Sequence, residues 1–202
     1  MGKDPFYGVF ELSSGKSAMF STKAQWPEAV VSDATTGTIE YALEHPMTFI
    51  MENEYNSDWY YRDDYTTEHT GWQAKKTIYD PCPAGWRVPD GGPDGIWAKA
   101  LGTTEDYIDS ESGWDTGESG ADLSKTEPAL ASGETIWYPF GGLIYSDSAA
   151  LRGMLEIAGC WSVTTRNYYG YVFSVTKPDK CLMPYIDSPR AHGCSVRCVK
   201  VL

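Results

Sequence analysis

Residues 76–90 read Lys-Thr-Ile-Tyr-Asp-Pro-Cys-Pro-Ala-Gly-Trp-Arg-Val-Pro-Asp, and residues 193–200 close the chain with Gly-Cys-Ser-Val-Arg-Cys-Val-Lys. The prolines on both sides of Cys82 make the first stretch a rigid turn. The second stretch has the β-branched residues of a short terminal strand and carries further cysteines. Together they predict that two segments far apart in the sequence lie side by side.

The composition is that of a packed globular domain. The chain has 202 residues, of which 42% are hydrophobic and 14% aromatic, and this excludes a disordered protein. One domain spanning 1–202 fits this length. The net charge of -12 argues against a nucleic-acid partner. No apolar run is long enough to span a membrane and no signal peptide is visible, so a leader or anchor would not be in this chain.

The five cysteines do not have the spacing of a zinc site. They are Cys82, Cys160, Cys181, Cys194 and Cys198, with no Cys-x-x-Cys pair and no histidine at zinc-finger spacing. Cys194 and Cys198 would share one face of a strand but lie too far apart to bond each other. Their partners must be elsewhere, and the odd total leaves at least one thiol unpaired within the chain.

The order of the predicted elements indicates an α+β fold. We expect a short helix within 36–51 that ends near Pro46, a strand after it, and a second short helix capped by Asp94. Residues 102–134 are rich in Gly, Ser, Asp and Glu, and predict a polar surface insertion outside the core. Most strands are predicted in the C-terminal half, where they would form an antiparallel sheet: 136–140, 142–145, 157–163, 169–175 and 195–201.

Three motifs resemble those of a known family. Asp-Pro-Cys-Pro-Ala-Gly-Trp-Arg-Val-Pro at 80–89, Gly-Cys-Trp-Ser at 159–162 and Gly-Cys-Ser-Val-Arg-Cys-Val at 193–199 are similar to the Fibrobacter succinogenes major paralogous domain family, which has a C-type-lectin-like fold. The resemblance covers roughly residues 36–202, and it implies that the N-terminal part of the domain is incomplete. It also implies that Trp86 and Trp161 are buried and that the Cys82 segment lies against the terminal strand at Cys198.

The calcium motifs of classical C-type lectins do not occur in this sequence. Glu-Pro-Asn, Gln-Pro-Asp and Trp-Asn-Asp are missing, and the nearest approach, Lys177-Pro178-Asp179, is interpreted as a hairpin turn. The acidic stretch 105–122 lacks EF-hand spacing and is interpreted as a solvated loop. We therefore expect ligand binding without a metal or cofactor.

No catalytic motif is recognisable either. The histidines are scattered, and there is no Gly-x-Ser-x-Gly, P-loop or His-Glu-x-x-His pattern. The same fold hosts formylglycine-generating enzymes, which use cysteines, but the cysteines here are better explained by strand pairing, and we expect no enzyme. Cys160 and Cys194 replace aromatic residues of the family pattern. They either face each other on neighbouring strands or are two buried free thiols.

Two stretches, 162–176 and 184–196, lack Lys, Glu, Gln, Met and Trp. These are the five residue types that a codon ending in C cannot encode. The residues between Pro184 and Arg190, where family members often have asparagines, can all be reached from the codon AAC by changing adenines. This pattern resembles the variable region of a diversity-generating retroelement, as in the phage major tropism determinant. The alternative is that a β-rich, Tyr-rich surface avoids long charged residues anyway.

Either origin predicts a surface with the chemistry of an antibody paratope, where rigid aromatic side chains are surrounded by small polar ones. Alternation along a strand places Tyr169 and Tyr171 on one face. A buried Phe173 is compatible with this, because alternation continues only while the strand is regular. Tyr168, Tyr169, Tyr171, Tyr185, Ile186, Asp187 and His192 are expected to form one exposed patch. The full set of predicted ligand-binding residues is Arg166, Asn167, Tyr168, Tyr169, Tyr171, Tyr185, Ile186, Asp187, Ser188 and His192.

These observations predict a ligand-binding domain displayed outside the cell, on a cell surface or a phage particle. Its partner would be a protein or glycan on a cell surface, bound by tyrosine anchors. A structural adhesin or pilus-tip subunit, in which the C-terminal region merely packs, is the alternative from another class. A formylglycine-generating type of enzyme is the third.

Overall fold

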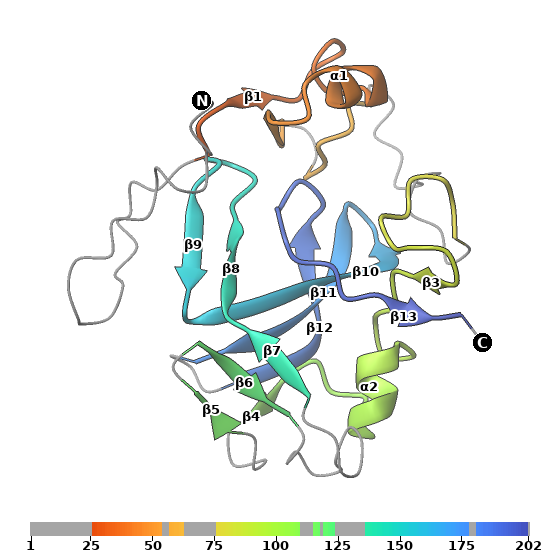
Figure 1. The fold of residues 1–202 in the computed structure, drawn as a ribbon, viewed down its shortest axis with the longest axis vertical. Helices are drawn as coiled ribbons and strands as arrows, with labels where there is room; N and C mark the ends of the chain where they lie inside the picture. Colours follow the sequence, from red (N-terminus) through yellow and green to blue (C-terminus); the bar gives the residue numbers. More distant parts are fainter. Residues whose placement is uncertain are drawn as a thin grey trace, which may run out of the picture.

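The computed structural model describes residues 26–53, 57–62, 76–109, 115–117, 119–123, 136–177 and 181–201. They form several small sheets, most of them antiparallel, with two short helices (Figure 1). This is the α+β class that the sequence predicts. The segment 26–53 lies at one end of the molecule, and the short strands between residues 108 and 122 lie at the other (Figure 1).

The main sheet is antiparallel and crosses the middle of the molecule in the order β10-β11-β12-β4. Its long strands are β10 (Ile157–Arg166), β11 (Tyr169–Thr176) and β12 (Cys181–Pro189), and the short strand β4 (Ile108–Asp109) lies at its edge. Val, Thr, Ile and aromatic residues are frequent in β10 and β11, and these residue types favour strands. The predicted location of the sheet in the C-terminal half is therefore correct.

The hydrophobic core covers one end of this sheet. Phe173 is fully buried, and its ring packs on Trp97 at 5.1 Å and on Tyr138 at 4.7 Å between centroids. The Trp97 indole N–H donates to the Tyr138 hydroxyl at 2.8 Å, so the polar atoms of this aromatic group are paired inside the core. Trp97 belongs to α2 (Ile96–Leu101), whose buried residues fix the helix against the sheet.

Smaller sheets surround this core. β1 (Ala29–Val31) pairs with β2 (Phe49–Met51) in parallel, and the short helix α1 (Ile39–Glu44) lies between them in sequence. β8 (Gly141–Ile144) pairs with β9 (Leu151–Met154). The three-stranded sheet contains β5 (Asp115–Thr116), β6 (Gly120–Asp122) and β7 (Trp137–Pro139).

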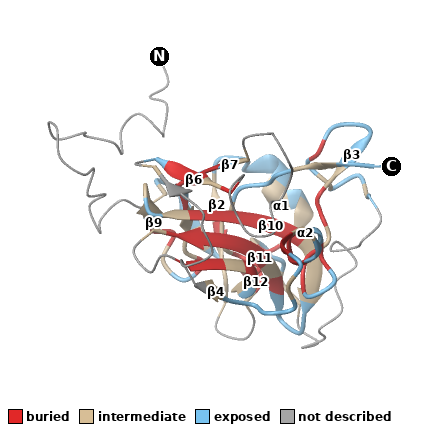
Figure 2. Cartoon of the chain, turned by 90° about the horizontal axis from the view of Figure 1, so that it is seen from below, coloured by how far each residue is buried: buried red, intermediate tan, exposed pale blue. Residues whose placement is uncertain are grey.

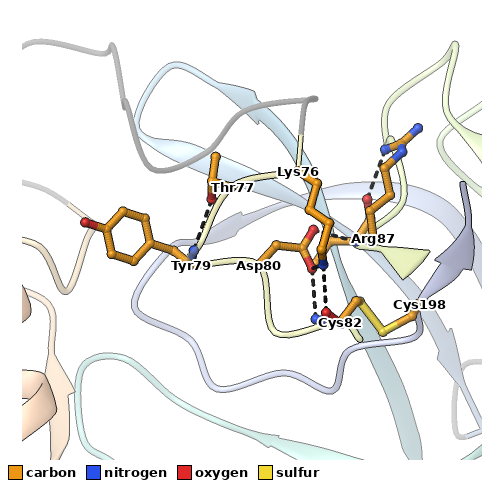
Figure 3. Close-up of polar contacts among 8 residues, drawn as sticks. Lys76, Thr77, Tyr79, Asp80, Cys82, Arg87 and Cys198 are labelled. Atoms are coloured by element: carbon orange, nitrogen blue, oxygen red, sulfur yellow. Dashed lines mark hydrogen bonds and ion pairs between the residues drawn. A yellow bond between two sulfur atoms is a disulfide. The ribbon is translucent and has the colours of Figure 1, made fainter. Parts of the chain in front are cut away.

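The Cys82 turn lies against the C-terminal segment, as the resemblance implies. Cys82 and Cys198 form a disulfide with 5.8 Å between their Cα atoms, and β3 (Trp86–Arg87) pairs beside it with β13 (Val199–Lys200). Asp80 holds the turn in shape: its carboxylate accepts hydrogen bonds from the backbone N–H groups of Cys82 (2.8 Å) and Val88 (3.0 Å) and an ion pair from Lys76 (Figure 3).

Several sequence expectations are corrected by the structure. Trp161 is buried as expected, but Trp86 is 41% exposed because two-residue β3 lies at the surface. Gly95 rather than Asp94 is the N-cap of α2, and no side chain caps it. The terminal strand has only two residues, and β12 was not predicted at all.

The polar region 102–134 also contributes more to the core than its composition suggests. Ala121 and Leu123 are fully buried and belong to the core cluster, because β6 pairs with β7 and carries them inward. β4 adds to the main sheet beside β12. The remaining residues of this region, with Pro178 and Asp179 of the expected hairpin turn, include positions outside the described residues.

Candidate ligand-binding face

The exposed end of the main sheet begins at the tight turn between β10 and β11. Arg166 pairs with Tyr169, so only Asn167 and Tyr168 form the turn. Asn167 has a φ of 51°, a conformation that asparagine tolerates better than most residues. The Arg190 guanidinium donates to the Asn167 carbonyl and so anchors the turn from below. Residues 166–169 are all exposed.

Strand register brings five side chains together on one face of the sheet. Residues directly opposite in an antiparallel pair share a face, and Arg166 lies opposite Tyr169 while Tyr171 lies opposite Asp187. The Arg166 guanidinium and the Asp187 carboxylate form an ion pair at 3.3 Å. Tyr185 joins the group through an edge-to-face contact with Tyr171, with 5.5 Å between ring centroids. We call Arg166, Tyr169, Tyr171, Tyr185 and Asp187 the tyrosine face.

Two of these tyrosines are held by neighbouring loops. The Tyr185 hydroxyl donates to the Thr104 carbonyl, and burial raises the pKa of Tyr185, with the Asp106 carboxylate, Tyr171 and Glu105 adding to the effect. The ring of Tyr171 lies under Gly92, where a Cβ atom would come within 2.9 Å of it. Because Tyr171 and Tyr185 are fixed in this way, a ligand would not have to order them on binding.

Comparisons of the chain with models of known protein families, with curated proteins and with solved structures found no match. The resemblance to the Fibrobacter succinogenes major paralogous domain family therefore stays a prediction. Any functional conclusion depends on the geometry of the chain itself.

The structure does not bring all the predicted site residues together. Asn167 and Tyr168 adjoin the tyrosine face in the turn. Ile186 and Ser188 lie opposite Val172 and Gly170, and strand alternation places both on the other face of the sheet. The expected single patch therefore divides at β12.

His192 lies away from both faces. Its ring packs on Tyr145 at 5.0 Å between centroids, and its Nδ1 accepts a hydrogen bond from the Ser146 backbone N–H at 3.4 Å. Burial lowers the pKa of His192, and the Asp147 carboxylate partly offsets this. Because the side chain is half-buried and packed, it belongs to the scaffold and not to the expected exposed patch.

Cys160, Cys181 and Cys194 are free thiols. The chain around Ser195 runs parallel to β10, with a hydrogen bond from the Trp161 N–H to the Ser195 carbonyl at 2.9 Å. A Cβ atom at Gly159 would lie 3.8 Å from the Cys194 sulfur, so Cys194 is on the Gly159 side of β10, whereas the Cys160 side chain points to the opposite side. Of the two alternatives, the structure favours free thiols over facing ones: Cys160 is buried and Cys194 half-buried.

Burial keeps both of these thiols protonated. It raises the pKa of Cys160 to about 11 and that of Cys194 to about 12, and Cys160 adds to the shift of Cys194. A thiol acts as a nucleophile or a metal ligand only as the thiolate. At neutral pH both are therefore thiols; Cys160 behaves as a small apolar core residue, and Cys194 is half-buried beside β10.

The part of the chain that the structure describes holds neither a metal-ligand cluster nor a membrane-spanning helix. Within it, no three or more His, Cys, Asp or Glu residues are grouped so that they could hold a metal ion. The same residues include no helix long and apolar enough to cross a membrane. Only part of the acidic stretch 105–122 is described.

Sequence reasoning missed three contributions to this region. Asp58 forms a buried ion pair with Arg190 at 3.5 Å, and Arg190 in turn holds the Asn167 turn. Thr104 anchors Tyr185 through its carbonyl. Gly91 and Gly92 allow their loop to lie directly on Tyr171. The Gly-Gly pair was a usable signal of close backbone approach, but nothing local marked the other two.

Proposed function

We propose that this chain is a ligand-binding domain of the C-type-lectin-like type that binds a protein or glycan through its tyrosine face. One observation carries the proposal. Side chains typical of a binding surface gather at the exposed end of strands whose other end is fixed in the core. Tyrosine buries a large area at a low entropy cost, and an adjoining ion pair and amide supply polar contacts.

The residues themselves favour recognition over simple packing. Tyr168 and Tyr169 are 37% and 38% exposed, although exposed aromatic rings reduce solubility unless they contact a partner. An adhesin subunit whose C-terminal region only packs would not need to expose these two tyrosines to solvent. The raised pKa values of Cys160 and Cys194 weigh against the enzyme alternative, because a catalytic cysteine requires an accessible thiolate.

Diversification by a retroelement is part of the proposal. Buried positions such as Val172 and Phe173 lack long charged residues for packing reasons alone. The exposed positions carry the argument, since Lys and Glu are common on surfaces and yet are missing there. These positions are Arg166, Asn167, Tyr168, Tyr169, Ile186, Asp187, Ser195 and Val196.

Display outside the cell is proposed on the same basis. The Cys82–Cys198 disulfide is compatible with a secreted or extracellular protein, because disulfides persist in oxidising compartments. A cell surface or a phage particle would meet this condition.

Two experiments test the proposal. Sequencing the genomic neighbourhood should reveal a reverse transcriptase beside a near-copy of the 3′ end that differs only at adenines; a neighbourhood without them would remove the diversification claim. In a glycan array and a screen of surface proteins, the best binder of the wild-type chain should be lost on Tyr169→Ser but kept on Trp86→Ser, a similarly exposed aromatic residue outside the face. Equal binding by both variants would refute the tyrosine face, and affinity should not change in excess chelator.

A further inference from the structure

A cavity of about 830 Å³ lies apart from the tyrosine face. Its walls come from α1 and the residues up to β2, from 58–62, from the turn at 77–81, from β10 and from 190–196. Figure 1 shows that these segments belong to both halves of the chain and meet at the end of the molecule that carries α1. The volume falls within the range of about 300–1,000 Å³ that is usual for small-molecule sites.

The rim of the cavity is apolar and open to solvent. Ile78 is 90% exposed, Leu43 76% and Tyr79 58%, and all three line the cavity. Leu43 and Ile39 form the apolar side of α1, a helix that has no buried residue of its own and faces this cavity. Apolar side chains gathered around one hollow, in contrast to single exposed ones, mark a binding site.

A buried ion pair, Arg190 with Asp58, is part of the cavity lining. The Arg190 side chain is fully buried, and its Nη2 is occupied by the Asn167 carbonyl. Nη1 lies 3.5 Å from the Asp58 carboxylate, too far for a good hydrogen bond, and neither Nη1 nor Nε has a hydrogen-bond acceptor. Buried donors without an acceptor cost free energy, which an acceptor atom brought by a ligand would recover.

The charged residues around the cavity also favour a ligand that carries a hydrogen-bond acceptor. Arg62 and Arg190 both line the cavity, in a chain whose net charge is -12. Among the described residues, two carboxylates line it: Asp58 faces Arg190, and Asp80 is taken by Lys76 and backbone N–H groups. The lining of the cavity therefore combines two guanidinium groups with an exposed apolar rim, and the buried Arg190 donors would become reachable only if a ligand head displaced the side chains that cover them.

We propose that this cavity binds a small amphiphile, with an aliphatic or aromatic body against the rim and one hydrogen-bond-accepting head, a carboxylate or an amide carbonyl, directed at the Arg190 guanidinium. The site is distinct from the tyrosine face and does not depend on the function proposed for it.

The test uses a fluorescent probe and matched competitors on the full chain. 1-Anilinonaphthalene-8-sulfonate has an apolar body and an accepting head, and its fluorescence should rise saturably with one site per chain. Octanoate and octanamide should displace it at concentrations about tenfold lower than octylamine, which has the same tail but a donating cation. A difference between octanoate and octanamide would tell whether the preferred head is an anion or a neutral carbonyl. Equal displacement by all three would overturn the proposal.

Two variants locate the site. Ile78→Ser should weaken probe binding roughly fivefold, whereas Ile96→Ser, a matched exposed isoleucine in α2 that does not line the cavity, should not change it. The double variant Arg190→Met with Asp58→Leu removes the ion pair without leaving a lone buried charge. It should abolish the preference for octanoate over octylamine while circular dichroism shows a folded chain. Probe binding insensitive to Ile78→Ser, or no saturable binding, would refute the proposal independently of whether the double variant folds.

Discussion

Strands β10, β11 and β12 differ sharply between their two ends (Figure 2). At one end lie the fully buried Phe173, Val175 and Leu182, packed against α2 and β7. At the other lie Arg166, Tyr169 and Asp187, all exposed. Tyr169 and Phe173 are on the same strand, four residues apart, so the same backbone supports a core and a surface.

One sheet can in this way combine a fixed scaffold with a replaceable surface. The buried end is specified by packing, where each side chain has several neighbours. The exposed end is held mainly by backbone pairing and by contacts from below, such as the Arg190 hydrogen bond to Asn167. Stability should therefore depend on the buried end, and binding on the exposed end.

The largest expected effect comes from the two aromatic residues of β11. Phe173→Ala should lower the free energy of unfolding by about 3–5 kcal/mol, because it leaves a cavity between Trp97 and Tyr138. Tyr169→Ala should cost less than about 1 kcal/mol. Urea denaturation of both variants measures the contrast, and similar losses would mean that the exposed end is also part of the core.

The disulfide should have the next largest effect. Replacing Cys82 and Cys198 by serine should lower the free energy of unfolding by about 2–4 kcal/mol, because the bond closes a loop across a sequence separation of 116 residues. Reductant should shift the urea midpoint of the wild type toward that of the double variant and leave the double variant unchanged. If reductant has no effect on the wild type, the two sulfurs are not bonded in solution.

Much of the buried end could be predicted from the sequence. The β-branched and aromatic runs at 157–163 and 169–175 indicated β10 and β11. A buried Phe173 was compatible with this pattern, although the period of two puts it on the face of Tyr169 and Tyr171 and did not itself predict its burial. The contact between Cys82 and Cys198 followed from the family resemblance. Each of these signals is either local or carried by a motif.

What could not be predicted depends on pairing between distant segments. β12 contains Pro184, Asp187, Ser188 and Pro189, which locally favour turns, and it becomes a strand by pairing with β11. That register also decides that Ile186 and Asp187 lie on opposite faces. Leu123 is one apolar residue in a polar region, and only the pairing of β6 with β7 brings it into the core.

Protonation of Asp80 should lower the stability of the scaffold at low pH. Burial alone would raise the pKa of Asp80, but hydrogen bonds from the Val88 and Cys82 N–H groups and the Lys76 ammonium outweigh it and hold the pKa below its ordinary value of 3.8. The stabilisation of the fold by the Asp80 carboxylate is therefore complete above pH 3.8. It is lost as the pH falls through the lower pKa that Asp80 has in the folded state. Asp80→Asn should cost about 1.5–3 kcal/mol at pH 7 and nothing once Asp80 is protonated.

The measurement is urea denaturation of wild type and Asp80→Asn between pH 7 and pH 2. The difference between the two should be constant down to about pH 4 and then shrink. Asp90→Asn is a control, because that carboxylate pairs with Arg87 at the surface and accepts no backbone N–H group of the turn. A difference that persists unchanged at pH 2 would show that the carboxylate charge is not what holds the Cys82 turn.

The smallest effect is expected at the exposed end, in the Arg166–Asp187 ion pair. The two side chains are 62% and 36% exposed and lie 3.3 Å apart, so water and salt screen their attraction. A double-mutant cycle with Arg166→Ser and Asp187→Ser should give a coupling free energy of about 0.2–1 kcal/mol at low salt and close to zero in 1 M NaCl. Coupling well above this range, or unaffected by salt, would make the pair a structural element of the sheet. Weak coupling means that either residue can be replaced without loss of the fold, as a surface rewritten by mutation requires.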